Sequence, residues 1–80
     1  MVRLTKHAAE AMQRRNIAIE WVEATLNAPD FTEADPRHPE RIRSYKAIAA
    51  FGGRILRVVH RRDGRDMIVI TVHFDRSATP

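Results

Sequence analysis

The first quarter of the chain carries apolar residues at helical spacing. At roughly 100° per residue, a helix over residues 4–15 places four of them on one stripe: Leu4, Ala8, Ala11 and Met12. Arg15 falls close to the middle of this stripe, and His7 lies at its edge. An arginine on a core-facing stripe is unfavourable unless its charge meets a partner or a ligand. His7 and Arg15 are therefore the first candidates for a functional role.

Capping and helix-breaking residues mark the ends of two helices. Thr5 can cap the first helix, and Asn16 suits the left-handed conformation that often ends one. A second helix is predicted over residues 19–27, where apolar residues again follow helical spacing. Asn27 and Pro29 end it.

After the second helix the pattern becomes that of strands. Two prolines and mixed charges predict a loop over 35–41, and a short edge strand over 30–34 precedes it. Three longer strands are predicted from apolar, β-branched and alternating runs, over residues 42–49, 54–61 and 66–74. The order of elements predicts one α+β domain that spans residues 1–80.

Asp63 and Gly64 form a dipeptide typical of a type I′ hairpin. If they are the two loop residues, Arg54 faces His73, and alternation sorts the last two strands into two faces. The face expected to pack on the helices carries Ile55, Arg57, Val59, Ile68, Ile70, Val72 and Phe74. The other face is mixed and is the expected working surface; it carries Arg54, Leu56, Val58, His60, Met67, Val69, Thr71 and His73.

Composition narrows the class of protein. Eighty residues with 44% hydrophobic content indicate one globular domain of small core. Because the chain has no cysteine, disulfides, a thiolate nucleophile and a cysteine-based zinc site are excluded. No apolar run approaches the roughly 20 residues of a membrane span, and no signal-peptide pattern opens the chain. A cytoplasmic protein that does not associate with membranes is expected.

The charge is distributed unevenly. Residues 1–40 have a net charge of −2 and residues 41–80 a net charge of +6, and the basic residues comprise twelve arginines and two lysines. Arginine binds phosphate oxygens in a bidentate manner and stacks on bases, which makes RNA a plausible partner. GC-rich coding gives the same arginine excess without any ligand, and the composition leaves both explanations open.

Four segments carry the motifs of a known family. They are H-A-x-x-x-M-x-x-R-x-I (His7 to Ile17), W-V-E-x-x-L (Trp21 to Leu26) with Pro29-Asp30 after it, G-G-R-x-L-R-V-V (Gly52 to Val59) and I-V-I-T-V (Ile68 to Val72). Over about residues 4–74 the chain resembles a bacterial family of unknown function placed among the RelE/ParE- and BrnT-like toxins. Their superfamily also takes in barnase and the EndoU-type nucleases.

The resemblance implies two N-terminal helices packed on a three- to four-stranded, mainly antiparallel sheet. It further implies RNA as a substrate, metal-independent ribonuclease activity and an antitoxin as protein partner. His7 and Arg15 match recurrent polar positions of the family, whereas Ala11 stands where many members carry a further arginine.

A ribonuclease that works without metal needs a base for the 2′-hydroxyl, an acid for the leaving oxygen and cations for the phosphorane. The catalytic candidates are His7, Arg15, His60 and His73, and the nucleic-acid-binding candidates are Arg54, Arg57, Lys46, Arg43 and Tyr45. Each also has a structural interpretation, such as an ion pair of Arg57 with Glu20 or Glu23. The histidines lack the spacing of a zinc site, so neither a metal nor another cofactor is expected.

Two functions of different classes thus remain. The first is a toxin-antitoxin-like RNA-binding domain with metal-independent ribonuclease activity. The alternative is a non-catalytic protein-interaction module of the same fold, whose sheet edge or basic face docks a protein partner, either an antitoxin-like protein or a second copy of the chain.

Overall fold

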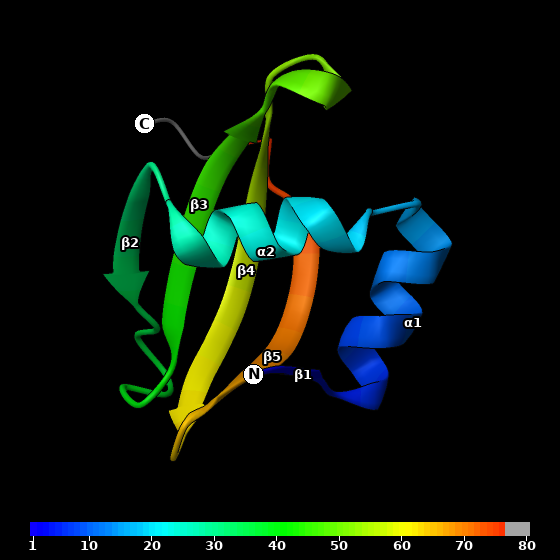
Figure 1. Ribbon diagram of the computed structural model, residues 1–80. Helices are drawn as coiled ribbons and strands as arrows, with labels where there is room; N and C mark the ends of the chain where they lie inside the picture. Colours follow the sequence, from blue (N-terminus) through cyan, green and yellow to red (C-terminus); the bar gives the residue numbers. More distant parts are fainter. Residues whose placement is uncertain (77–80) are drawn as a thin grey trace.

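A computed structural model describes residues 1–76 of the chain (Figure 1). Two helices accompany a five-stranded mixed sheet whose strand order is β1-β5-β4-β3-β2. In chain order the elements are β1 (Val2–Leu4), α1 (Lys6–Arg15), α2 (Ile19–Asn27), β2 (Phe31–Ala34), β3 (Ile42–Ile48), the short 3₁₀ helix η1 (Ala49–Phe51), β4 (Arg54–Asp63) and β5 (Asp66–Phe74). The prediction of an α+β domain with two helices is confirmed, and the sheet has more strands than the three to four expected.

The additional strand, β1, lies where the first helix was expected to begin. Val2–Leu4 pairs in parallel with Met67–Val69 of β5, and the backbone N–H of Thr5 donates to the carbonyl of Val69 (3.0 Å). The Thr5 hydroxyl then accepts from the N–H of Ala8 (3.1 Å), and α1 starts at Lys6. The prediction that Leu4 lies on the helix stripe was therefore wrong, because pairing with a distant strand fixes its backbone.

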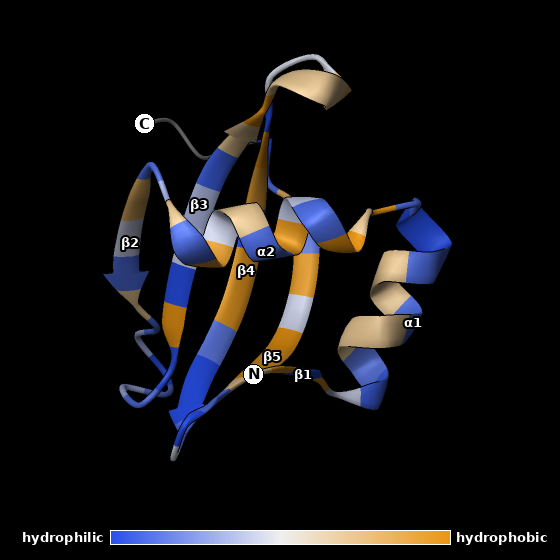
Figure 2. Cartoon of the chain, viewed as in Figure 1, coloured by the Kyte–Doolittle hydropathy of each residue, from blue (hydrophilic) through white to orange (hydrophobic). Residues whose placement is uncertain are grey.

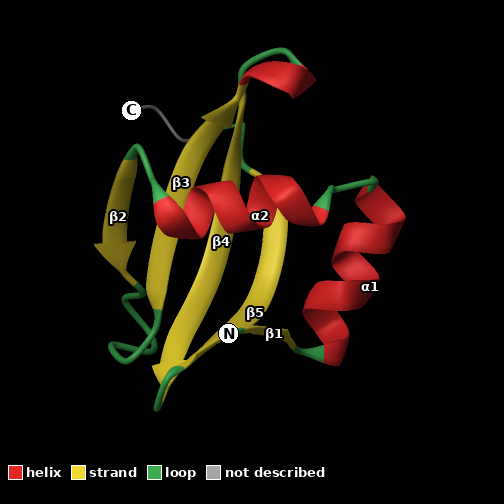
Figure 3. Ribbon diagram, viewed as in Figure 1, coloured by secondary structure: helices red, strands yellow, loops and turns green. Residues whose placement is uncertain are grey.

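The core lies between one face of the sheet and the helices. α2 crosses this face over β3 and β4, and α1 packs against β5 and β1 (Figures 1 and 3). Figure 2 shows that apolar residues predominate in β5 and in the part of β4 next to α2. The central buried side chains are Ala8, Ile17, Val22, Ile48, Leu56, Val58, Val69 and Val72. We name this side the helix face of the sheet, and no helix of residues 1–76 covers the opposite side, the open face (Figure 1).

The predicted hairpin register was wrong. Asp63 pairs with Asp66, so the two loop residues are Gly64 and Arg65. Gly64 has φ +61°, but Asn16 is the only non-glycine residue with positive φ in the described part of the chain, so Arg65 does not take the type I′ conformation.

The predicted faces were reversed along all of β4, and along β5 only on the loop side of a bulge. Val59 pairs with Thr71 while His60 pairs with Val69, so one residue of β5, Ile70, is extra. Of the seven side chains expected on the helix face, only those of Val72 and Phe74 are at positions that face the helices. The positions of Ile55, Arg57, Val59, Ile68, Thr71 and His73 belong to the open face.

The cap of α1 should contribute measurably to stability. The Thr5 hydroxyl accepts from Ala8 and also donates to the carbonyl of Ile70 (2.9 Å), which joins the helix start to β5. We expect Thr5→Ala to lower the free energy of unfolding by about 1 kcal/mol, as measured by urea denaturation. Thr32→Ala, at an exposed position of β2, is the matched control and should change it by less than about 0.5 kcal/mol. Equal midpoints for the Thr5 variant and wild type would show that the cap is not stabilising.

Candidate functional site

Four strands bring one row of side chains together on the open face. Phe31 of β2 pairs with Tyr45 of β3, Tyr45 with Arg57 of β4, and Arg57 with His73 of β5. Arg43 lies in the next row, where it pairs with Glu33 and Val59. Directly opposed side chains have Cβ atoms about 4.5–5.5 Å apart, so these groups can act on one ligand. We name Arg43, Tyr45, Arg57 and His73 the open-face site; all four were among the sequence candidates.

A hydrogen-bonded cluster fixes one end of the open-face site. Tyr45 donates its hydroxyl to a Glu33 carboxylate oxygen (2.8 Å), and Arg43 Nη1 donates to the same oxygen (3.2 Å). Asp35 lies 3.6 Å from Arg43 Nε, and the ring of Phe31 stacks on that of Tyr45 with centroids 4.4 Å apart. Because Tyr45 is only 3% exposed, it holds Arg43 and Glu33 in place and has little surface for stacking on a base.

The ionisable groups of this cluster favour an ionised Glu33 and a neutral Tyr45. Hydrogen bonds from Tyr45 and Arg43 lower the pKa of Glu33 below its usual range. Burial, followed by the hydrogen bond to the Glu33 carboxylate, raises the pKa of Tyr45. The phenol therefore keeps its proton at neutral pH and remains a donor.

Arg57 lies at the centre of the open-face site. Its Nη1 is 3.5 Å from Asp75 Oδ2, just after the end of β5. Its Nε is buried and, among the residues described, has no hydrogen-bond partner, and the same is true of Arg43 Nε. A buried unsatisfied donor costs free energy, which an acceptor on a ligand would relieve; Arg41 Nε, outside this site, is a third such atom.

His73 is half-buried beside Arg57. Burial lowers the pKa of this imidazole, and the nearby charges of Arg57 and Arg15 lower it further, against an opposing contribution from Asp75. His73 is therefore neutral at pH 7 and can accept a proton.

Two further candidates contribute to the fold rather than to the open face. His60 is 7% exposed on the helix face, 2.7 Å from Ser44 Oγ and 2.9 Å from Met67 Sδ through its two ring nitrogens. Lys46 donates to the carbonyl of Ala28 (2.8 Å), which fastens β3 to the end of α2.

The remaining candidates lie at the ends of α1 and at the start of β4. His7 is exposed in the first turn of α1 and Arg15 in the last, about 12 Å apart along the helix axis at 1.5 Å per residue. The structure therefore does not bring this pair together. Arg15 instead lies close to Arg54, with which it lines a cavity. Ala11, between His7 and Arg15 on α1, is buried and 3% exposed.

Sequence reasoning missed the carboxylates of the open-face site: Glu33, Asp35 and Asp75. Glu33 could have been found, because it follows Phe31 by two residues in a predicted edge strand and so shares its face. Asp75 lies outside every predicted strand, and no local pattern connects it with Arg57.

Fold and site together define a small α+β domain with an arginine-rich, helix-free sheet face. A family model with the description "Domain of unknown function (DUF4258)" matches residues 4–74, and the chain belongs to this family. No curated protein and no solved structure matches the chain. Within residues 1–76 no cluster of three or more histidine, cysteine or acidic residues could hold a metal ion, and none of the helices there is long and apolar enough to cross a membrane.

Proposed function

We propose that the open-face site binds RNA and cleaves it without a metal ion, in the manner of the RelE- and BrnT-like toxins that the sequence resembles. The observation that carries this proposal is the pairing of Arg57 with both Tyr45 and His73 on a sheet face that no described helix covers. This places a cation for phosphate beside an imidazole that is neutral at pH 7. The net charge of +4 favours an anionic partner.

The chemistry follows from these groups. His73 takes the proton of a ribose 2′-hydroxyl, and the 2′-oxygen attacks the adjacent phosphorus. The guanidinium of Arg57, with Arg43 beside it, stabilises the charge of the phosphorane through bidentate hydrogen bonds. The bond from phosphorus to the 5′-oxygen breaks as that oxygen takes a proton from water, which leaves a 2′,3′-cyclic phosphate. Tyr45 and Glu33 hold Arg43 and so position it.

RNA must compete with a carboxylate of the protein itself. Asp75 pairs with Arg57, and the pair is largely shielded from solvent, with side-chain exposures of 23% for Arg57 and 15% for Asp75. A phosphate bound at Arg57 therefore displaces Asp75 or shares the guanidinium with it.

Removal of the central cation tests the proposal. We expect Arg57→Gln to weaken binding of a short single-stranded RNA by about tenfold or more, since one charge-assisted contact to phosphate is lost. The slope of log Kd against log salt should fall by about 1. Fluorescence anisotropy of labelled RNA in the presence of EDTA measures both quantities.

Arg62→Gln is the matched control, because Arg62 is exposed near the hairpin loop and outside the open-face site. It removes the same charge and should change the affinity only slightly. Equal losses for the two variants would show general charge attraction, which contradicts a site at Arg57.

A protein-interaction module is the second candidate function, and the edge strand β2 favours it. β2 pairs only with β3 in the described sheet, so its other edge is available to a strand from an antitoxin-like protein or a second copy. The same RNA-binding measurement separates the two functions, because a module of this kind does not bind RNA at Arg57.

A further inference from the structure

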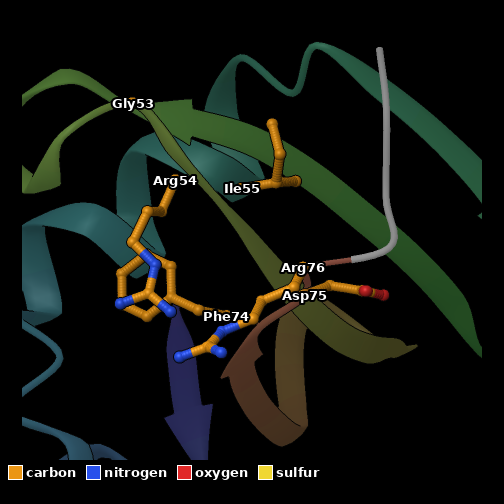
Figure 4. A pocket seen from close by; sticks show the side chains of 6 residues that line it. All are labelled: Gly53, Arg54, Ile55, Phe74, Asp75 and Arg76. Carbon is orange, nitrogen blue, oxygen red and sulfur yellow. The ribbon is translucent and has the colours of Figure 1, made fainter.

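A cationic pocket lies at the end of the sheet, apart from the row of the open-face site. It has a volume of about 330 Å³ and is lined by Arg15, Phe51, Arg54, Phe74 and Arg76, which we name the arginine pocket. A neighbouring cavity of about 500 Å³ shares three of these residues and is also lined by Gly53, Ile55 and Asp75. Figure 4 shows the Arg54 guanidinium over the ring of Phe74 with that of Arg76 on the same side, whereas Asp75 points away.

Among the described residues, three guanidinium groups line this pocket and no carboxylate does. Arg15 comes from the end of α1, Arg54 from the start of β4, and Arg76 follows β5. In the described part of the chain none of the three forms an ion pair, although eight other ion pairs are present. Like charges gathered around one space repel each other, and a bound anion relieves that repulsion.

The guanidinium of Arg54 lies over two aromatic rings. The Arg54 Cζ lies 5.3 Å from the ring centroid of Phe51 and 5.6 Å from that of Phe74, and the two rings stack on each other at 4.7 Å. An aromatic ring attracts the cation through its face and accepts no conventional hydrogen bond from it, so the N–H groups of Arg54 remain for a ligand. If Arg54 served only to shield the two rings from solvent, that role would not require Arg15 and Arg76 beside it.

The floor of the pocket offers apolar surface as well as charge. Phe51 is 36% exposed and is one of five exposed large hydrophobic residues in the described part of the chain. Trp21 supports it from α2, with ring centroids 5.7 Å apart. Exposed aromatic surface next to arginines is the combination with which proteins bind a base and its phosphate together.

We propose that the arginine pocket binds one nucleotide of an RNA chain, with the phosphate on the guanidiniums of Arg15, Arg54 and Arg76 and the base against Phe51. This inference rests on the proposed function, to which it adds a second nucleotide subsite. The two sites are neighbours: Asp75 lines the 500 Å³ cavity and pairs with Arg57 of the open-face site. The charge of Arg15 also acts on His73, which indicates that the pocket and the open face lie within electrostatic reach of each other.

Titration with adenosine 5′-monophosphate tests the pocket. We expect this probe to shift the NMR signals of the Phe51 and Arg54 amides and of the arginine Nε–H groups in the pocket. Arg54→Gln should weaken binding about tenfold, whereas Arg62→Gln should not. Phe51→Leu should weaken binding of the nucleotide but not of inorganic phosphate, which has no base. Shifts spread evenly over exposed arginines, or equal binding of the two probes, would overturn the inference, and thermal unfolding shows whether each variant is folded.

Binding of a tetranucleotide RNA separates this inference from the proposed function. If both proposals hold, Arg57→Gln and Arg54→Gln each weaken binding of the tetranucleotide, and only Arg54→Gln weakens binding of the mononucleotide. If Arg57→Gln weakens the tetranucleotide and Arg54→Gln does not, the proposed function stands and the second subsite is overturned. If neither variant affects it, both proposals fail.

Discussion

Replacement of His73 by glutamine is expected to slow RNA cleavage by about 10²–10⁴-fold, the range typical of a lost general base. Glutamine keeps a polar side chain of similar size but cannot take up a proton at neutral pH. Since Arg57 and Arg43 still contact the phosphate, the affinity for RNA should change only a few-fold. The measurement is the initial rate of 2′,3′-cyclic phosphate formation at saturating RNA, in EDTA.

The pH dependence of the same rate provides a second readout. Burial and the charges of Arg57 and Arg15 hold the pKa of His73 below its ordinary value of 6.5. The imidazole therefore becomes a competent base as pH rises through a value under 6.5, and the rate should rise there and then level off. This rise should be absent in His73→Gln.

His38→Gln is the matched control, because His38 is exposed in the loop before β3, with Glu40 3.8 Å away. It should cleave at the wild-type rate. A His73 variant that cleaves as fast as wild type, with the same pH profile, would remove this residue from the mechanism and leave the open face with a binding role alone.

Local signals account for the parts of the fold that the sequence predicts best. The predicted bounds of the second helix and of the last strand, 19–27 and 66–74, coincide with α2 and β5. The bounds of each element are marked by residues within it or next to it; Asn27, for example, ends the run of apolar residues at helical spacing. β1 has no such mark: three residues form a strand only because Met67–Val69, more than sixty residues away in the chain, supplies its partner.

The faces of the sheet could not be predicted for two reasons, an ambiguous pattern in β4 and an extra residue in β5. Period-two alternation assigns a face only while the register is unbroken. The extra residue Ile70 breaks it in β5. β4 alternates without interruption, but both of its faces carry apolar residues next to arginines, so its pattern does not show which face packs on the helices. The loop at Gly64 and Arg65 adds a second shift.

These shifts explain which site residues were placed correctly. The alternation put His60 and His73 on one working surface and Arg57 on the opposite, packed face. In the structure His73 and Arg57 are direct neighbours on the open face, and His60 lies on the helix face. Residue type thus indicated the candidate residues, whereas the geometry that unites Arg57 with His73 depends on pairing across strands that a linear pattern does not record.

The opposite placement of the two strand histidines leads to opposite expectations for their variants. We expect His60→Ala to lower the free energy of unfolding by about 2–4 kcal/mol, as measured by urea denaturation. The variant leaves a space in the helix face and deprives the buried Ser44 hydroxyl of its partner at 2.7 Å. The cleavage rate per folded molecule should remain that of wild type, since His60 lies on the helix face, away from the proposed RNA site.

The contribution of His60 to stability should also depend on pH. Burial lowers the pKa of His60 in the folded chain below 6.5, the ordinary value that it has in the unfolded chain. Between the folded and the unfolded pKa, the unfolded chain therefore binds a proton at His60 that the folded chain does not bind. The contribution of neutral His60 to the free energy of unfolding is therefore complete above pH 6.5 and is lost as the pH falls below 6.5. Wild type should therefore lose stability between pH 7.5 and 5.5, and His60→Ala should lose less over the same interval, with the remainder due to His73, whose pKa is lowered as well. If instead His60→Ala matched wild type in stability and abolished cleavage, His60 would be the catalytic histidine, and the assignment of the open face as the RNA site would have to be given up.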